Sequence, residues 1–185
     1  MDDFTYFADK VEQSHGHFCA GIALGTKITL AAMKALELDP HQKHKDLIVY
    51  TEIDRCMTDA LQSITGCTLG HRSLKYINYG KFAATFVNTT TGKAVRGTVK
   101  EKFKGGGTKE EIIKAMSAIP EDKLVSLQEV EIDIPRNELP GPSAEKAMCS
   151  ACGEWVVDGR AIQREGAWLC QACAGNGYYR VINKR

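Results

Sequence analysis

The seven cysteines of this 185-residue chain form two groups whose spacing suits different chemistry. Two Cys-x-x-Cys pairs lie near the C-terminus, at Cys149, Cys152, Cys170 and Cys173. This is the spacing of a zinc ribbon, in which four thiolates hold one tetrahedral Zn2+ ion. So short a segment has too few apolar residues for a core of its own, so we expect the ion to stabilise it. A tetrathiolate iron site is the main alternative, and either ion would have a structural role because its coordination is filled.

The second group begins with His15, His17 and Cys19, which alternate along the chain. In an extended segment all three side chains would point the same way. Cys19 also precedes a long helical pattern, and a helix N-terminus favours a thiolate over a thiol. Imidazole and thiolate at this spacing indicate a transition-metal site or a thiol nucleophile beside a base.

Cys56 is the next candidate, because it follows an apolar run that we expect to be a strand inside a sheet. Open sheets place their ligands just beyond the strand ends. Asp59 lies three residues further on, where it could be a ligand, an acceptor for a ligating imidazole, a base or simply a helix cap. Cys67 and His71 flank a loop that could reach the same site or simply pack.

Hydrophobic periodicity indicates an α+β body. Gly21 and Gly25, four residues apart, leave room for a close backbone neighbour, and Gly105-Gly106-Gly107 predicts a flexible connection. The expected helices cover 2–14, 19–38, 55–65 and 108–118, and the expected strands cover 47–53, 74–79, 82–87, 93–100 and 125–134.

A proline-rich linker divides the chain, since three of the five prolines fall between Pro135 and Pro142. The predicted domains are therefore an α+β domain at 1–134, a linker at 135–147 and a zinc-ribbon module at 148–185. Within the module, short strands at 154–157 and 161–164 are expected on either side of an Asp158-Gly159 turn.

The bulk composition is that of a globular protein, with 43% hydrophobic and 25% charged residues. A net charge of +1 gives no long-range attraction to nucleic acid or to an anionic membrane, so neither is expected as a partner. The acidic N-terminus lacks the apolar core of a signal peptide, and no run is long enough to span a membrane. These features predict a cytoplasmic protein with reduced thiols.

Three segments of the α+β body form a long combined pattern: His15-Gly16-His17-x-Cys19-x-Gly21-x3-Gly25-x-Lys27, Glu52-x3-Cys56-x2-Asp59-Ala60-x-Gln62-x2-Thr65-Gly66-x-Thr68-x-Gly70 and Tyr79-Gly80-Lys81. Together they resemble the FmdE family, the family of the E subunit of formylmethanofuran dehydrogenase, over about residues 10–135. A C-terminal zinc module also occurs in members of that family.

The resemblance implies a mixed β-sheet flanked by helices and a homodimer. It implies a metal held by His17, Cys19 and Cys56, with His15 the next candidate. This chain departs from the family pattern at Ala20, where the family usually has proline. The family takes its name from a molybdenum or tungsten enzyme that reduces CO2 onto methanofuran, so a redox enzyme complex is the implied partner. Many members occur without that enzyme, so the name does not establish an activity.

Three functional hypotheses follow. The first is an accessory protein with a structural Zn2+ and a second ion, Zn2+, Ni2+, Fe2+ or Cu+, at the His/Cys site. The second is an enzyme in which Cys19 is a nucleophile and His17 its base, or in which a metal activates water with Asp59 as acid or base. The third is a regulator whose ribbon and basic tail, residues 178–185, contact nucleic acid or RNA polymerase.

Overall fold

The computed structural model describes residues 2–100, 106–143 and 145–183. The chain divides into two compact units, Met1–Asp133 and Ile134–Arg185. Each unit is described below by itself.

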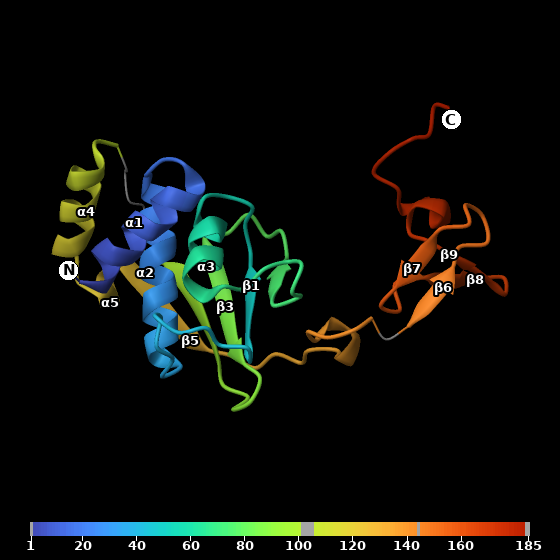
Figure 1. The fold of residues 1–185 in the computed structure, drawn as a ribbon, viewed down its shortest axis with the longest axis horizontal. Helices are drawn as coiled ribbons and strands as arrows, with labels where there is room; N and C mark the ends of the chain where they lie inside the picture. The colour runs from blue at the N-terminus through green and yellow to red at the C-terminus, as the bar shows by residue number, and fades with distance from the viewer. Residues whose placement is uncertain (1, 101–105, 144, 184–185) are drawn as a thin grey trace. The chain divides into compact units, whose positions relative to one another are not determined.

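The first unit contains the helices, coloured blue to yellow in Figure 1: α1 (Asp3–His15), α2 (Ala20–Ala35), α3 (Met57–Thr65), α4 (Lys109–Ala118) and the short α5 (Glu121–Leu124). The sequence pattern predicts the first four of these helices. It does not predict α5, whose single turn follows Pro120 and is too short for a periodic signal. Among the described residues, no helix combines the length and the apolar character needed to cross a membrane.

A five-stranded mixed sheet forms the other layer of this unit. Its strands are β1 (Leu47–Thr51), β2 (Leu74–Tyr76), β3 (Ala83–Asn88), β4 (Ala94–Val99) and β5 (Val125–Glu129), in the order β2-β1-β3-β4-β5. Strand β1 pairs with β2 in parallel, whereas the other pairs are antiparallel. The apolar run at 47–53 therefore lies inside the sheet, as predicted, and strand β5 is shorter than expected.

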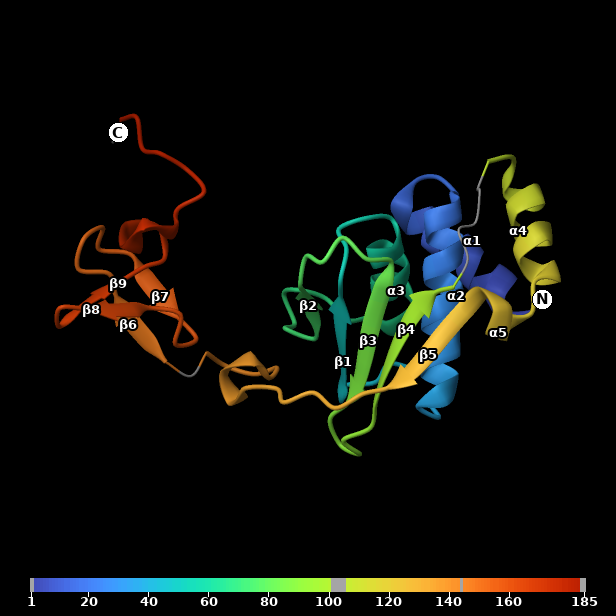
Figure 2. The ribbon, with the colours of Figure 1, turned by 180° about the vertical axis from the view of Figure 1, so that it is seen from behind.

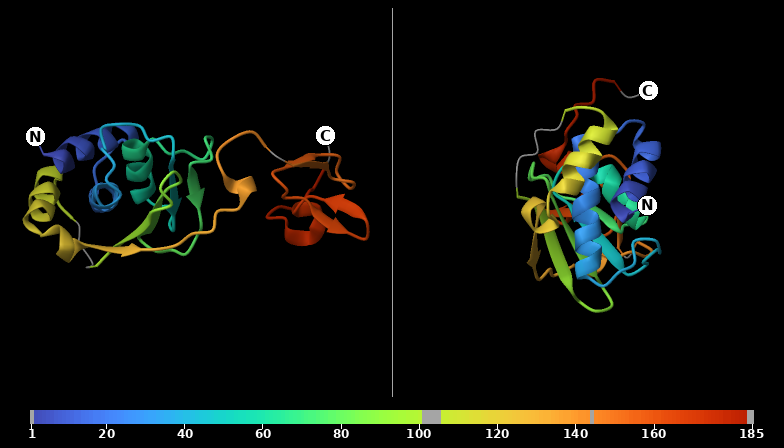
Figure 3. Two further views of the ribbon diagram at one scale, coloured as in Figure 1. Left: turned by 90° about the horizontal axis from the view of Figure 1, so that it is seen from below. Right: turned by 90° about the vertical axis from the view of Figure 1, so that its left-hand side faces the viewer.

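Helices α2 and α3 cover one face of the sheet, and α1 packs against these two helices (Figures 2 and 3). Close packing depends on glycines at two contacts. A Cβ on Gly25 of α2 would lie 2.9 Å from the Cβ of Ala60 and 2.9 Å from the Cα of Met57, both on α3. A Cβ on Gly97 of β4 would lie 2.8 Å from Cγ2 of Ile28. The glycine spacing of α2 thus fixes how closely α3 approaches it, as the sequence predicts.

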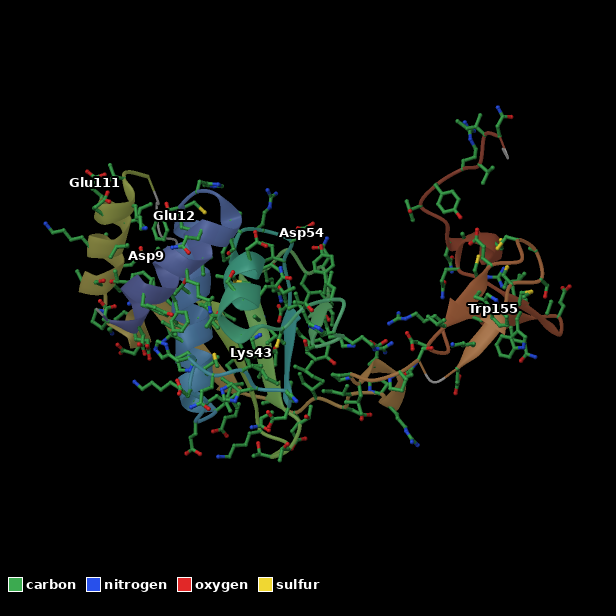
Figure 4. All side chains as sticks on the ribbon, in the orientation of Figure 1. Asp9, Glu12, Lys43, Asp54, Glu111 and Trp155 are labelled. Atoms are coloured by element: carbon green, nitrogen blue, oxygen red, sulfur yellow. The ribbon has the colours of Figure 1, made fainter. Side chains whose placement is uncertain are left out.

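Salt bridges connect helix α4 to helix α1. Thr108 begins α4 with a capping box that includes Glu111, in agreement with the predicted helix start. The Nζ of Lys109 lies 2.7 Å from Asp9 and also contacts Glu12; both acids lie on α1 and are labelled in Figure 4. The predicted connection before α4 lies partly outside the described residues, because Gly105 is not among them.

The second unit consists of two small hairpins. Strand β6 (Lys146–Met148) pairs with β7 (Trp155–Val157), and β8 (Ile162–Arg164) pairs with β9 (Ala167–Leu169). The predicted strands on either side of the Asp158-Gly159 turn are present as β7 and β8, but they belong to different sheets and do not pair with each other. A 3-10 turn, Arg136–Glu138, precedes the hairpins, and a π-helical segment, Ala172–Asn176, follows them.

Few side chains are buried in this second unit. Among its described residues these are Cys149, Asp158 and Ala174. Large side chains such as Trp155, labelled in Figure 4, are instead exposed. So small a core cannot offset the conformational entropy of folding, which leaves a cross-link as the main source of stability.

Candidate metal centres

Three helix ends meet at the first candidate centre. Helix α1 ends at His15, α2 begins after Cys19 and α3 begins after Cys56. Helix N-termini carry partial positive charge and stabilise thiolates, whereas a helix C-terminus stabilises cations such as a metal–imidazole group. The fold therefore places each donor at the kind of helix end that suits it.

The structure brings His15, His17 and Cys19 together. One donor atom from each lies within 4.8 Å of the other two, and the imidazole ring centroids are 4.5 Å apart. The expected extended segment is wrong in its backbone, because His15 is still helical and Gly16 turns the chain with φ +92°. The side chains converge through this left-handed helix cap, whose N–H donates to the carbonyl of Glu12 at 2.8 Å.

His15 is oriented by a carboxylate. Its Nδ1 lies 2.5 Å from Oδ2 of Asp59, which belongs to the first turn of α3. Its Nε2 is buried and has no hydrogen-bond partner among the described residues. A carboxylate on one ring nitrogen and an unsatisfied second nitrogen are the usual arrangement of a ligating histidine. Asp59 thus lies where an acceptor for a ligating imidazole is needed, which is one of the roles expected for it.

Cys56 lies beside this group but is not part of the close cluster. A Cβ on Gly21 would be 3.2 Å from the Cβ of Cys56 and 3.6 Å from the Sγ of Cys19. Both cysteine side chains therefore lie close to Gly21. Burial raises the pKa of the Cys56 thiol above its ordinary value, and the neighbouring Cys19 side chain raises it further. We call His15, His17, Cys19 and Cys56 the upstream site.

The structure does not bring Cys67 or His71 into the upstream site. The Sγ of Cys67 is buried and donates to the carbonyl of Leu47 at 3.4 Å, and burial raises the pKa of this thiol. Nδ1 of His71 lies 2.9 Å from Oγ1 of Thr68 in the same loop. Both side chains therefore have local structural partners, which agrees with the loop-packing interpretation.

The second candidate centre is the four-cysteine cluster. Cys149, Cys152, Cys170 and Cys173 each place a sulfur within 4.8 Å of the others, and the cluster fits a zinc ribbon. The backbone N–H groups of Cys170 and Cys152 lower the pKa of Cys149 to about 6, whereas hydrogen bonds with the neighbouring thiols raise the pKa of Cys173 to about 12. Four adjacent thiols cannot all ionise by themselves, but a divalent cation removes that obstacle.

The sequence analysis does not predict the ion pair between Arg96 and Glu52. Arg96 of β4 donates from Nε and Nη2 to the two carboxylate oxygens of Glu52 at 2.6 and 2.7 Å. The carbonyl of Glu52 also accepts from the N–H groups of Tyr79 and Lys81, so it holds that loop against the end of β1. An arginine inside a strand pattern is the only sequence signal of this pair, and it does not identify the partner.

Together, the α+β unit and the two ligand clusters define a protein with Cys/His groups that can hold metal ions. The family model described as "FmdE, Molybdenum formylmethanofuran dehydrogenase operon" matches residues 14–133. The chain therefore belongs to the FmdE family, as the sequence motifs indicate.

Two known proteins are similar over most of this chain. The crystal structure of a tungsten formylmethanofuran dehydrogenase FmdE-like protein from Syntrophus aciditrophicus matches with a TM-score of 0.60 and 22% identity, covering 96% of this chain and 95% of that one. A probable S-adenosyl-L-methionine-binding protein from Archaeoglobus fulgidus is 30% identical over 202 residues. That alignment covers 95% of this chain and 54% of the relative, so the chain spans about half of that protein's length.

Proposed function

We propose that the protein is an accessory metal-binding protein with two ions per chain: a structural Zn2+ in the ribbon and an exchangeable transition metal at the upstream site. The observation that carries the proposal is the buried, unsatisfied Nε2 of His15 beside His17 and Cys19, with Asp59 on the opposite nitrogen. A purely structural histidine would lose stability by leaving a buried polar atom without a partner.

The proposed ligands are His15, His17 and Cys19, with Cys56 as the fourth. Two imidazoles and two thiolates suit Zn2+, Ni2+ and Fe2+, and also Cu+. When bound, the ion would supply a Lewis-acidic centre whose ligands can exchange. The protein would contribute the rest: Asp59 would hold the tautomer of His15, and the N-termini of α2 and α3 would stabilise the thiolates.

The exposed position of His17 favours an accessory role over closed structural binding. A ligand that is open to solvent can be displaced by a partner's donor, so the ion can be delivered or sensed. The FmdE family description refers to a formylmethanofuran dehydrogenase operon, which supports a redox enzyme complex as the partner. We further propose that the protein acts as a homodimer.

The metal content of the full chain tests this function. We expect two equivalents in the wild type and one after Cys19→Ser with Cys56→Ser. Cys67→Ala is the matched control, because Cys67 is a cysteine of the same unit outside the upstream site, and this variant should retain two equivalents. One equivalent in the wild type, unchanged by the double substitution, would refute the proposal.

Thiol alkylation separates this function from the enzyme hypothesis. His17 and Cys19 offer donor atoms within 4.8 Å of each other, and this proximity of an imidazole and a thiol is the observation that favours an enzyme. A nucleophilic Cys19 should react quickly with iodoacetamide in the protein as purified. A ligating Cys19 should react only after a chelator has removed the ion, and this is the result we expect.

A further inference from the structure

The close packing of α2 against α3 brings two cysteines together at the helix starts. Cys19 is the N-cap of α2 and Cys56 the N-cap of α3. Gly25 lets the helices approach until only a hydrogen atom fits between it and Met57. One turn earlier, a Cβ on Gly21 would lie 3.2 Å from the Cβ of Cys56 and 3.6 Å from the Sγ of Cys19. The two cysteine side chains therefore lie close together because small residues line this helix contact.

The two thiols are also free to react with each other. Both side chains lie beside Gly21, and both residues are partly exposed to solvent. In the described part of the chain, neither side chain caps its own helix by a hydrogen bond, so neither is held in place by the helix that it begins. Cys67 differs, since it is buried and donates to the carbonyl of Leu47.

We propose that Cys19 and Cys56 form a reversible disulfide that releases the metal ion from the upstream site. The metal part of this inference rests on the proposed function, whereas the disulfide itself depends only on the geometry of the two helix starts. A disulfide needs its Cβ atoms about 3.8 Å apart, a separation that the backbones of the two close helix starts set, and rotation about the two Cα–Cβ bonds then brings the sulfurs together.

A low-molecular-weight disulfide such as oxidised glutathione would be the oxidant. The thiolate of one cysteine attacks a sulfur of oxidised glutathione, which forms a mixed disulfide and expels one glutathione thiolate. The thiolate of the second cysteine then attacks the protein-bound sulfur and expels the second glutathione thiolate. The two cysteines are oxidised, two glutathione molecules are reduced, and the protons of the thiols end on glutathione.

Oxidation would remove both thiolate ligands at once. Only His15 and His17 would remain, and two imidazoles hold a divalent ion far less tightly than four donors. The ribbon is a separate cluster whose four thiolates stay on their own ion. Oxidation would therefore empty the upstream site selectively.

Peptide mapping of the full chain tests the disulfide. Trypsin releases Cys19 in peptide 11–27, and it releases Cys56 together with Cys67 in peptide 56–72. We would therefore use the Cys67→Ala variant, which removes the ambiguity, and treat it with oxidised glutathione before and after metal removal. We expect a cross-linked 11–27/56–72 pair, formed at least ~10-fold faster in the metal-free protein because a ligated thiolate is a poor nucleophile.

Metal release is measured in the same samples with a colorimetric chelator. We expect cross-linking to free one of the two ions and dithiothreitol to restore binding. Stable glutathione adducts without a cross-link would overturn the proposal, and so would a cross-linked protein that retains both ions. Failure of the proposed function would give a different result. The Cys19→Ser, Cys56→Ser variant would then bind as much metal as the wild type, whether or not the cross-link forms in the Cys67→Ala variant.

Discussion

Asp59→Asn is the substitution that separates a ligating His15 from a structural one. Asp59 accepts a hydrogen bond from Nδ1 of His15 at 2.5 Å, which leaves Nε2 with its lone pair free for an ion. An asparagine amide can donate to Nδ1 instead, which would place the ring proton on Nε2 and block ligation. Outer partners of ligating histidines contribute 10–100-fold in metal affinity, or about 1.4–2.7 kcal/mol.

The assay is a chelator competition with Co2+ or Zn2+ on the full chain, with thermal unfolding as a check on stability. Ser63→Ala is the matched control, because Ser63 contacts Ser14 at 2.7 Å in the same contact between α1 and α3. We expect Asp59→Asn to weaken the upstream site by about 10-fold or more and Ser63→Ala to leave it unchanged. Equal affinity of Asp59→Asn and wild type would refute the assigned role of Asp59.

Three further experiments test how the fold supports the upstream site. Gly25→Ala should destabilise the protein by about 1–3 kcal/mol in thermal unfolding, because its Cβ would overlap α3; unchanged stability would contradict the packing. Gly16→Ala and Gly66→Ala should each lower the free energy of unfolding by ~1 kcal/mol, because both glycines have positive φ and open surroundings. Of the two variants, only Gly16→Ala should weaken metal binding. Arg96→Met should lower the free energy of unfolding, measured with urea, by about 3–5 kcal/mol because Glu52 stays buried without its partner. The double variant with Glu52→Gln should recover part of this loss.

Much of the fold is predictable from local sequence signals. Apolar periodicity identifies helices α1 to α4, and Thr108 with Glu111 gives the start of α4. The strand pairing of the ribbon is not predictable in this way, because Asp158-Gly159 signals a turn but says nothing about which strands pair. Which strands of the ribbon pair depends on which segments the four cysteines bring close to one another, and this is set by the tertiary structure.

The candidate sites show the same division. The spacing of His15, His17 and Cys19 identifies a cluster, but the structure forms it through a helix end and the positive φ of Gly16 rather than through an extended segment. The contact of Asp59 with His15 depends on how α3 packs against α1, so it appears only in three dimensions. Donor types are therefore readable in sequence, whereas the sequence leaves open which of its several possible roles Asp59 takes.

An anomalous X-ray edge scan of crystals of the full chain tests the two-ion proposal most directly, since it counts, identifies and places the ions together. We expect two ions per chain: Zn2+ among Cys149, Cys152, Cys170 and Cys173, and a transition metal bound by His15, His17, Cys19 and Cys56. A single ion in the ribbon, with no anomalous peak between His15 and Cys19 in metal-supplemented crystals, would contradict the proposal.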